Sequence, residues 1–172
     1  MQHFPRVSLG LNAVIVSVAL GLSCGCGQTT SHVKRVLDDW HDAAADADED
    51  RYFGHMTDNA VFLGTDATER WTKAEFQAYA HPYFAKGQGW TYVPQSRYVM
   101  FGDSTRVAWF DEKLLNAKYG ECRGTGVLER HDGRWLISHY NLTVPVPNDL
   151  LDGVVKMIRE TPAAAPAGAP PR

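Results

Sequence analysis

Two side chains in the C-terminal half of the sequence have the chemistry of a proton-transfer pair, Asp111 and His139. A carboxylate enclosed by apolar side chains has a raised pKa and becomes a usable general base, and a histidine, with an ordinary pKa of about 6.5, is a suitable partner. Arg123 or Asn141 could stabilise the negative charge of an enolate-like intermediate. A second interpretation stays open: Asp111 and Arg123 form an ion pair that lowers the pKa of the carboxyl group, and His139 is a polar residue of a cavity wall.

These residues lie in a region whose pattern predicts β-strands, in which successive side chains point to opposite faces. Asp111 then shares a face with Trp109, and His139 shares a face with Asn141. Asp132-Gly133 is the sharpest hairpin signal in the chain. Four strands are expected, at residues 90–101, 105–115, 121–130 and 134–144.

The N-terminal half predicts helices, at residues 31–46 and 50–56, followed by a short strand at 60–64. Thr72 and Glu75 form a capping-box signature for a further helix, which should end at Gly87. A terminal helix is expected after Pro147. Helices followed by an antiparallel meander predict an α+β fold, in which the helices cover the apolar face of a curved sheet that encloses a pocket.

The length and composition of the chain limit its organisation. Its 172 residues are enough for one domain, expected at residues 31–160, and residues 161–172, rich in proline and alanine, predict a disordered tail. Lysine and arginine number 17 against 20 for aspartate and glutamate, a net charge of −3, which argues against a nucleic-acid partner. No segment reaches the roughly 18 apolar residues of a transmembrane helix.

The first 26 residues predict an export signal. Arg6 precedes an uncharged apolar run at residues 7–22, and the small residues with Cys24 and Cys26 that follow resemble the lipobox of bacterial lipoproteins. Lipidation of either cysteine would attach an exported protein to the cell membrane or outer membrane, on the periplasmic or extracellular face. The sequence does not decide between Cys24 and Cys26, and a plain secretory signal is the alternative.

Metal and cofactor chemistry find no support in the sequence. The seven histidines are dispersed without ligand spacing. The acidic run at 46–50 resembles the start of a calcium loop, but Arg51 stands where the turn needs glycine. No glycine-rich loop has nucleotide-binding spacing. We therefore expect neither a metal nor a cofactor.

The chain resembles the SnoaL-like domains of the nuclear-transport-factor-2-like superfamily over about residues 33–149. The residues that carry the resemblance are Ala60–Thr65 (AVFLGT), Glu69–Trp71 (ERW), Val107–Glu112 (VAWFDE), Gly120–Leu128 (GECRGTGVL) and Asp132–Tyr140 (DGRWLISHY). The resemblance implies a cone-shaped, curved antiparallel sheet that is packed by N-terminal helices and encloses a pocket. It also implies a homodimer, formed through the opposite sheet face, where Phe110 and Glu112 would lie.

In similar domains the face of the last strand that carries His139 points into the cavity. The resemblance thereby implies a pocket made by Trp71, Tyr83, Trp109, Asp111, Arg123, His139 and Asn141. We expect a lipid-anchored domain of the cell envelope that binds a small, partly apolar or aromatic ligand. One alternative is a cofactor-independent isomerase, dehydratase or cyclase that uses Asp111 and His139, as related enzymes use a carboxylate or a histidine–carboxylate pair. A second alternative is a dimeric interaction module without catalysis.

Overall fold

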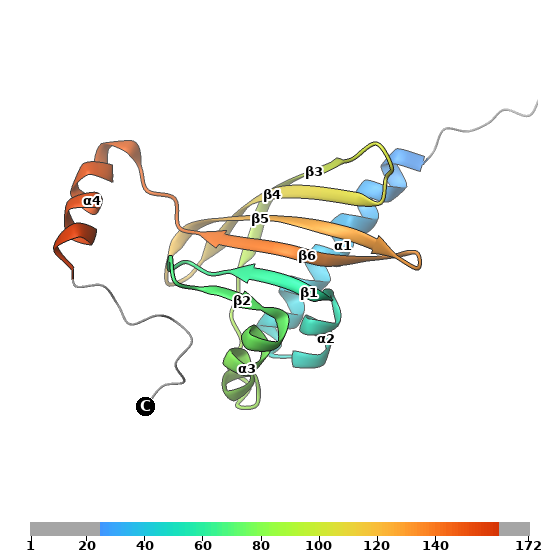
Figure 1. Ribbon diagram of the computed structural model, residues 1–172, viewed down its shortest axis with the longest axis horizontal. Coiled ribbons are helices and arrows are strands. Elements are labelled where there is room, and N and C mark those ends of the chain that lie inside the picture. Colours follow the sequence, from blue (N-terminus) through green and yellow to red (C-terminus); the bar gives the residue numbers. More distant parts are fainter. Residues whose placement is uncertain (1–24, 162–172) are drawn as a thin grey trace, which may run out of the picture.

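The computed structural model describes residues 25–161 and confirms the α+β fold (Figure 1). Cys24 and the tail at 162–172 lie outside the described residues, and the side chain of Cys26 is not described either. The helices are α1 (Gly25–Ala45), α2 (Glu49–Gly54), α3 (Lys73–Phe84) and α4 (Leu151–Glu160), the last preceded by a 3₁₀ turn η1 (Asn148–Leu150). The strands are β1 (Met56–Leu63), β2 (Arg70–Thr72), β3 (Val93–Phe101), β4 (Val107–Asn116), β5 (Gly120–His131) and β6 (Arg134–Thr143).

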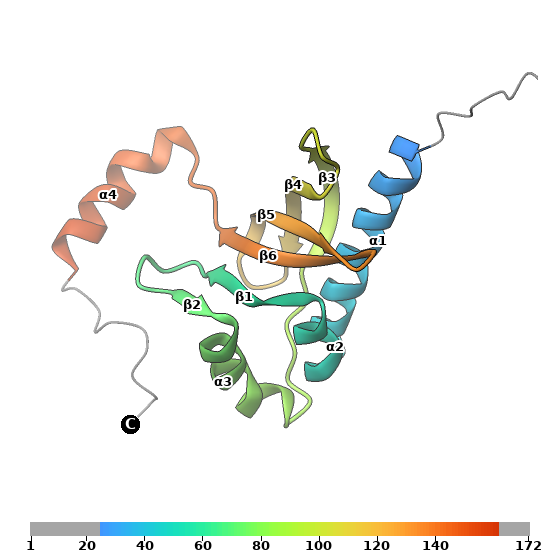
Figure 2. The ribbon, with the colours of Figure 1, turned by 45° about the vertical axis from the view of Figure 1, so that its right-hand side comes forward.

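The six strands form one sheet in the order β2-β1-β6-β5-β4-β3. The four predicted strands, β3 to β6, form an antiparallel meander, and β1 joins its edge by pairing in parallel with β6. The predicted capping box begins α3: the Thr72 side chain accepts a hydrogen bond from the Glu75 backbone N–H, and Glu75 accepts one from the Thr72 N–H. The sheet is strongly curved, and α1, α2 and α3 pack beside it, whereas α4 does not (Figure 2).

The concave face of the sheet holds the core. On β4 the buried side chains are Ala108, Phe110, Glu112 and Leu114, so every second residue faces inward. Aromatic rings fill much of the space between this face and the helices. Representative ring-centroid separations are 4.9 Å for Trp40–Tyr52, 4.6 Å for Trp40–Tyr140 and 4.0 Å for Phe62–Phe76. Each such contact contributes about 0.5–1.5 kcal/mol beyond the area it buries.

An irregularity in the pairing of β5 with β6 changes which residues of β6 face inward. Leu128 pairs with Ile137 and Val127 pairs with His139, so Ser138 is an extra residue in β6. Ile137 is buried before this point and Tyr140 after it. A strict alternation starting from Ile137 would have placed His139 inside, but the extra residue turns it to the other face.

Helix α4 stands away from the sheet in Figure 1. Val154 and Val155 of this helix are half-buried, whereas four apolar residues of the helix and the preceding turn are exposed: Leu150, Leu151, Met157 and Ile158. Within residues 25–161, no helix is both long and apolar enough to cross a membrane.

Candidate functional site

Asp111 lies on the convex face of the sheet, and the expectation that it faces an enclosed pocket is wrong. Asp111 and Trp109 are both exposed, because β4 turns its other row of residues toward the core. Arg123 is exposed as well and stands opposite Lys113, whereas Asp111 stands opposite Thr125. Within the described part of the chain, the predicted Asp111–Arg123 ion pair does not form.

His139 and Asn141 are half-buried on the same convex face. The cross-strand partner of His139 is Val127, and that of Asn141 is Thr125. His139 and Asp111 therefore belong to different cross-strand rows, and the described residues include no hydrogen bond between them. The structure does not assemble the predicted proton-transfer pair in a pocket.

Glu112, expected on the outer face, is the buried carboxylate of the concave face. Its Oε1 lies 2.8 Å from His41 Nε2 and accepts a hydrogen bond from the Tyr140 hydroxyl at 3.1 Å. Its Oε2 accepts a hydrogen bond from Arg97 Nε at 2.7 Å. We call Glu112, His41, Arg97 and Tyr140 the buried clamp, because they join α1 to β3, β4 and β6.

The clamp holds Glu112 in its charged form. Burial by itself raises the pKa of this carboxyl group, but hydrogen bonds and charge from His41 and Arg97 outweigh burial and leave the pKa below its ordinary value. Burial raises the pKa of Tyr140 well above the ordinary value, and the neighbouring Glu112 charge raises it further. A buried carboxylate with three partners is a poor general base, so the clamp has the character of a structural network.

Gly124 is required for the clamp to close. It stands opposite Glu112 on the next strand, and a Cβ atom there would overlap the Tyr140 hydroxyl and lie 2.7 Å from Glu112 Oε1. Gly126 faces the same side. Two glycines at alternate positions of a strand indicate a face approached closely by other groups, and this signal was available in the sequence.

Partly exposed aromatic side chains gather where β2 leads into α3. Trp71 is buried and stacks on Tyr79, with ring centroids 5.1 Å apart, and Tyr79 contacts Tyr83 at 5.6 Å. The helix places Tyr79 and Tyr83 on one face because they are four residues apart. Tyr79 is 47% exposed and Tyr83 is 44% exposed. Trp71 and Tyr83 were predicted as ligand-facing residues. Tyr83 is partly exposed, whereas Trp71 is buried and packs against the partly exposed ring of Tyr79.

Two further tyrosines, Tyr92 and Tyr119, belong to this region. Burial raises the pKa of Tyr79, and Tyr83, Glu69 and Tyr119 lie near enough to raise it further. Burial likewise raises the pKa of Tyr92 to about 12, with contributions from Cys122, Tyr119 and Glu69. The Glu69 charge therefore raises the pKa of both Tyr79 and Tyr92. We define the tyrosine rim as Tyr79, Tyr83, Tyr92 and Tyr119 with Trp71 and Glu69.

Three members of the rim were not predicted from the sequence, because Tyr92, Tyr119 and Glu69 come from three separate connecting segments. The spacing of Tyr79 and Tyr83 was the one local signal. Within residues 25–161, no group of three histidine, cysteine or carboxylate side chains converges as metal ligands.

The order of helices and strands is that of a SnoaL-like domain. A family profile described as "SnoaL-like domain" matches residues 33–147, and the chain belongs to this family. Among curated proteins no sequence matches.

Solved structures with the same fold come from several bacteria. A cystatin-like-fold domain of unknown function from Nostoc punctiforme is 13% identical, with a TM-score of 0.63 over 79% of this chain and 88% of that one. A nuclear-transport-factor-2-like protein of unknown function from Pseudomonas putida is 16% identical, with a TM-score of 0.56 over 72% and 91%. A putative calcium/calmodulin-dependent protein kinase II association domain from Xanthomonas campestris is 22% identical, with a TM-score of 0.51 over 67% and 86%. These similarities establish the fold.

Proposed function

We propose that this protein is a ligand-binding domain of the cell envelope that holds a small, planar, partly apolar molecule at the tyrosine rim. The observation that carries the proposal is the run of contacting rings, Trp71, Tyr79 and Tyr83, in which both tyrosines are partly exposed and Trp71 packs behind Tyr79. Exposed aromatic groups that cluster mark interaction sites more often than single exposed residues do.

The chemistry of the rim indicates its ligand. Tyrosine rings offer flat apolar faces for stacking, and their hydroxyl groups donate and accept hydrogen bonds at the edge. The Glu69 carboxylate accepts hydrogen bonds, so a ligand with a hydroxyl or ammonium group beside an aromatic ring would satisfy both features. Stacking and hydrogen bonding are the interactions that these rings and this carboxylate suit, and we propose binding in preference to catalysis.

A fluorescent neutral aromatic, N-phenyl-1-naphthylamine, tests the rim directly. Tyr79→Ala and Tyr83→Ala should each weaken its binding about 2- to 10-fold, the value of one aromatic contact. Tyr98→Ala is the matched control, because Tyr98 is 64% exposed but lies on the convex face of the sheet. Equal binding by all three variants and the unmodified protein would contradict the proposal. If the rim binds the probe, native mass spectrometry of protein purified from its own cell envelope would identify the natural ligand.

Membrane attachment through Cys24 or Cys26 is a second part of the proposal. The small residues and cysteines after the apolar segment support it. Replacing both cysteines by alanine should move the protein from the membrane fraction to the soluble fraction, and the two single variants would show which cysteine carries the lipid. Retention of the double variant on membranes after removal of the apolar run at residues 7–22 would rule out this anchor.

Self-association is a second candidate function, favoured by the convex sheet face. Tyr98 and Trp109, which is 43% exposed, present aromatic surface there. Asp111 and Arg123 have no ion-pair partner within the described residues, so a second copy related by twofold symmetry could pair the acid of one with the base of the other. Sedimentation of the unmodified protein and of Trp109→Ser tests this candidate. A monomer at every concentration would remove it.

A further inference from the structure

A groove of about 570 Å³ opens between the β3–β4 turn and the β5–β6 turn. The backbone N–H of Arg130 donates a 2.8 Å hydrogen bond to the carbonyl of Arg106, which ties the two turns together. The groove is therefore fixed at the end of the sheet. Its lining consists of Ser104, Thr105, Arg106, Arg130, His131, Asp132 and Gly133.

Two guanidinium groups in this groove have no carboxylate partner. Neither Arg106 nor Arg130 forms an ion pair within residues 25–161, whereas Arg51 and Arg97 both do. Arg134 stands opposite His131 on the neighbouring strand and also has no ion pair among the described residues.

The carboxylates near the groove offset only part of this charge. Asp132 is the carboxylate among the lining residues, and Glu129 lies just behind them, 3.1 Å from the His131 ring. Unpaired arginines presenting forked donors beside a serine and a threonine match the oxygens of a phosphate group better than any neutral ligand.

The position of the groove suggests where that phosphate comes from. The β3–β4 and β5–β6 turns lie at the same end of the molecule as the beginning of α1 (Figure 1). Between Cys26 and the buried residue Val33, the helix rises only about 10 Å. A lipid on either cysteine would hold this end of the domain against the membrane.

We infer that the groove binds the phosphate groups of anionic membrane lipids and so orients the domain on the membrane. The location of the groove at the membrane rests on the proposed lipid anchor, while its phosphate chemistry rests on the arginines alone. The ten residues of β4 separate Arg106 from the β4–β5 turn that carries Tyr119, a distance of about 33 Å along the strand. Bound in this way, the domain would hold its tyrosine rim away from the lipid surface.

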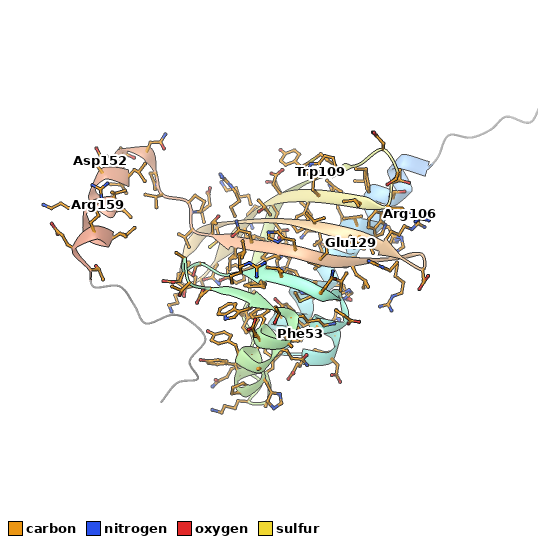
Figure 3. The ribbon with its side chains drawn as sticks, in the orientation of Figure 1. Phe53, Arg106, Trp109, Glu129, Asp152 and Arg159 are labelled. Carbon is orange, nitrogen blue, oxygen red and sulfur yellow. The ribbon has the colours of Figure 1, made fainter. Side chains whose placement is uncertain are left out.

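Vesicle co-sedimentation tests the inference with a chain that begins at Gly25 and carries Cys26→Ala, so that neither an acyl chain nor the apolar run at residues 7–22 contributes. Vesicles of phosphatidylglycerol mixed with phosphatidylcholine are compared with vesicles of phosphatidylcholine alone. Arg106→Gln with Arg130→Gln should weaken binding to the anionic vesicles about 25-fold, or about 5-fold for each arginine. The matched control is Arg159→Gln, because Arg159 lies on α4 at the opposite end of the molecule from Arg106 (Figure 3). It should change binding by less than about 2-fold.

The outcomes separate the sources of phosphate. Equal losses in the double variant and the control, or equal binding to both kinds of vesicle, would overturn the inference. Calorimetric binding of inorganic phosphate that is lost in the double arginine variant, together with equal binding to both kinds of vesicle, would overturn the lipid assignment and indicate a soluble phosphate compound. Binding of N-phenyl-1-naphthylamine should be unchanged in the double arginine variant, and membrane release of the cysteine variant is scored separately. Failure of the groove is therefore distinct from failure of the rim or of the anchor.

Discussion

Glu112→Gln should destabilise the protein by about 3 kcal/mol at neutral pH. Removing one partner of a buried ion pair costs about 3–5 kcal/mol, because the remaining charge stays buried. Arg97 keeps a 2.6 Å contact with Asp38 and a hydrogen bond to the Lys34 carbonyl, so the lower end of that range applies. Its Nη2 is buried and already has no hydrogen-bond partner within the described chain. Without the Glu112 carboxylate, Arg97 would have a second buried nitrogen, Nε, without a charged acceptor.

The matched control is Asp111→Asn, one residue away on the same strand but exposed, for which we expect a change below about 0.5 kcal/mol. Urea unfolding followed by circular dichroism measures the free energy of unfolding of both variants. If Asp111→Asn were as destabilising as Glu112→Gln, the assignment of the two faces of β4 would be refuted. Equal stability of Glu112→Gln and the unmodified protein would refute the buried clamp.

The pH dependence of this effect has a definite sign. The pKa of Glu112 is lowered in the folded protein, so its stabilising contribution is fully present above the ordinary carboxyl value of 4.5. That contribution is lost as the pH falls through the lower folded-state pKa. The difference in unfolding free energy between the unmodified protein and Glu112→Gln should accordingly shrink below about pH 4.5.

Three further predictions follow from the packing. Gly124→Ala should cost about 1–3 kcal/mol in urea unfolding, and adding Tyr140→Phe should recover part of the loss by removing the hydroxyl that the new methyl group meets. Trp71→Ala should lower the unfolding free energy by about 3–5 kcal/mol and also weaken aromatic-probe binding, because Trp71 packs on both Phe76 and Tyr79. Deleting residues 147–172 should change the unfolding free energy of the remaining domain by less than about 0.5 kcal/mol, since α4 stands apart from the sheet; a larger loss by calorimetry would show hidden contacts.

The architecture was predictable from local patterns in the sequence. The helical spacing of α1, the Thr72–Glu75 capping box and the Asp132-Gly133 turn are each encoded within a few residues, and the structure contains all three elements. Helical periodicity, capping boxes and hairpin turns are local signals, so the sequence alone can indicate them. The order of these elements along the chain, helices first and an antiparallel meander second, then predicted the α+β fold.

The face of β4 was not predictable in the same way. Its two rows both combine aromatic and acidic residues: Trp109 with Asp111 on one, Phe110 with Glu112 on the other. Alternation alone cannot decide which row is buried. The decision depends on His41, which lies 71 residues from Glu112 in the sequence, and on Arg97 from a neighbouring strand.

The prediction that His139 faces the pocket was wrong for another reason. A single extra residue, Ser138, reverses the alternation of β6, and the sequence carries no glycine or proline there to mark it. The tyrosine rim was found only in part, because its members meet through tertiary structure rather than through spacing.

The buried clamp also bears on how the chain reaches its folded state. The β3–β6 meander is built from neighbouring hairpins, whose closure involves short loops and a small loss of chain entropy. The contacts of α1 with Arg97 and Glu112 span 59 to 71 residues, so they add long-range order to an otherwise local topology. We expect the first helix of the domain to dock last, after the curved sheet has formed the surface that receives it. Until then His41 and Glu112 remain hydrated, and the unfinished protein exposes the aromatic concave face that α1 later covers.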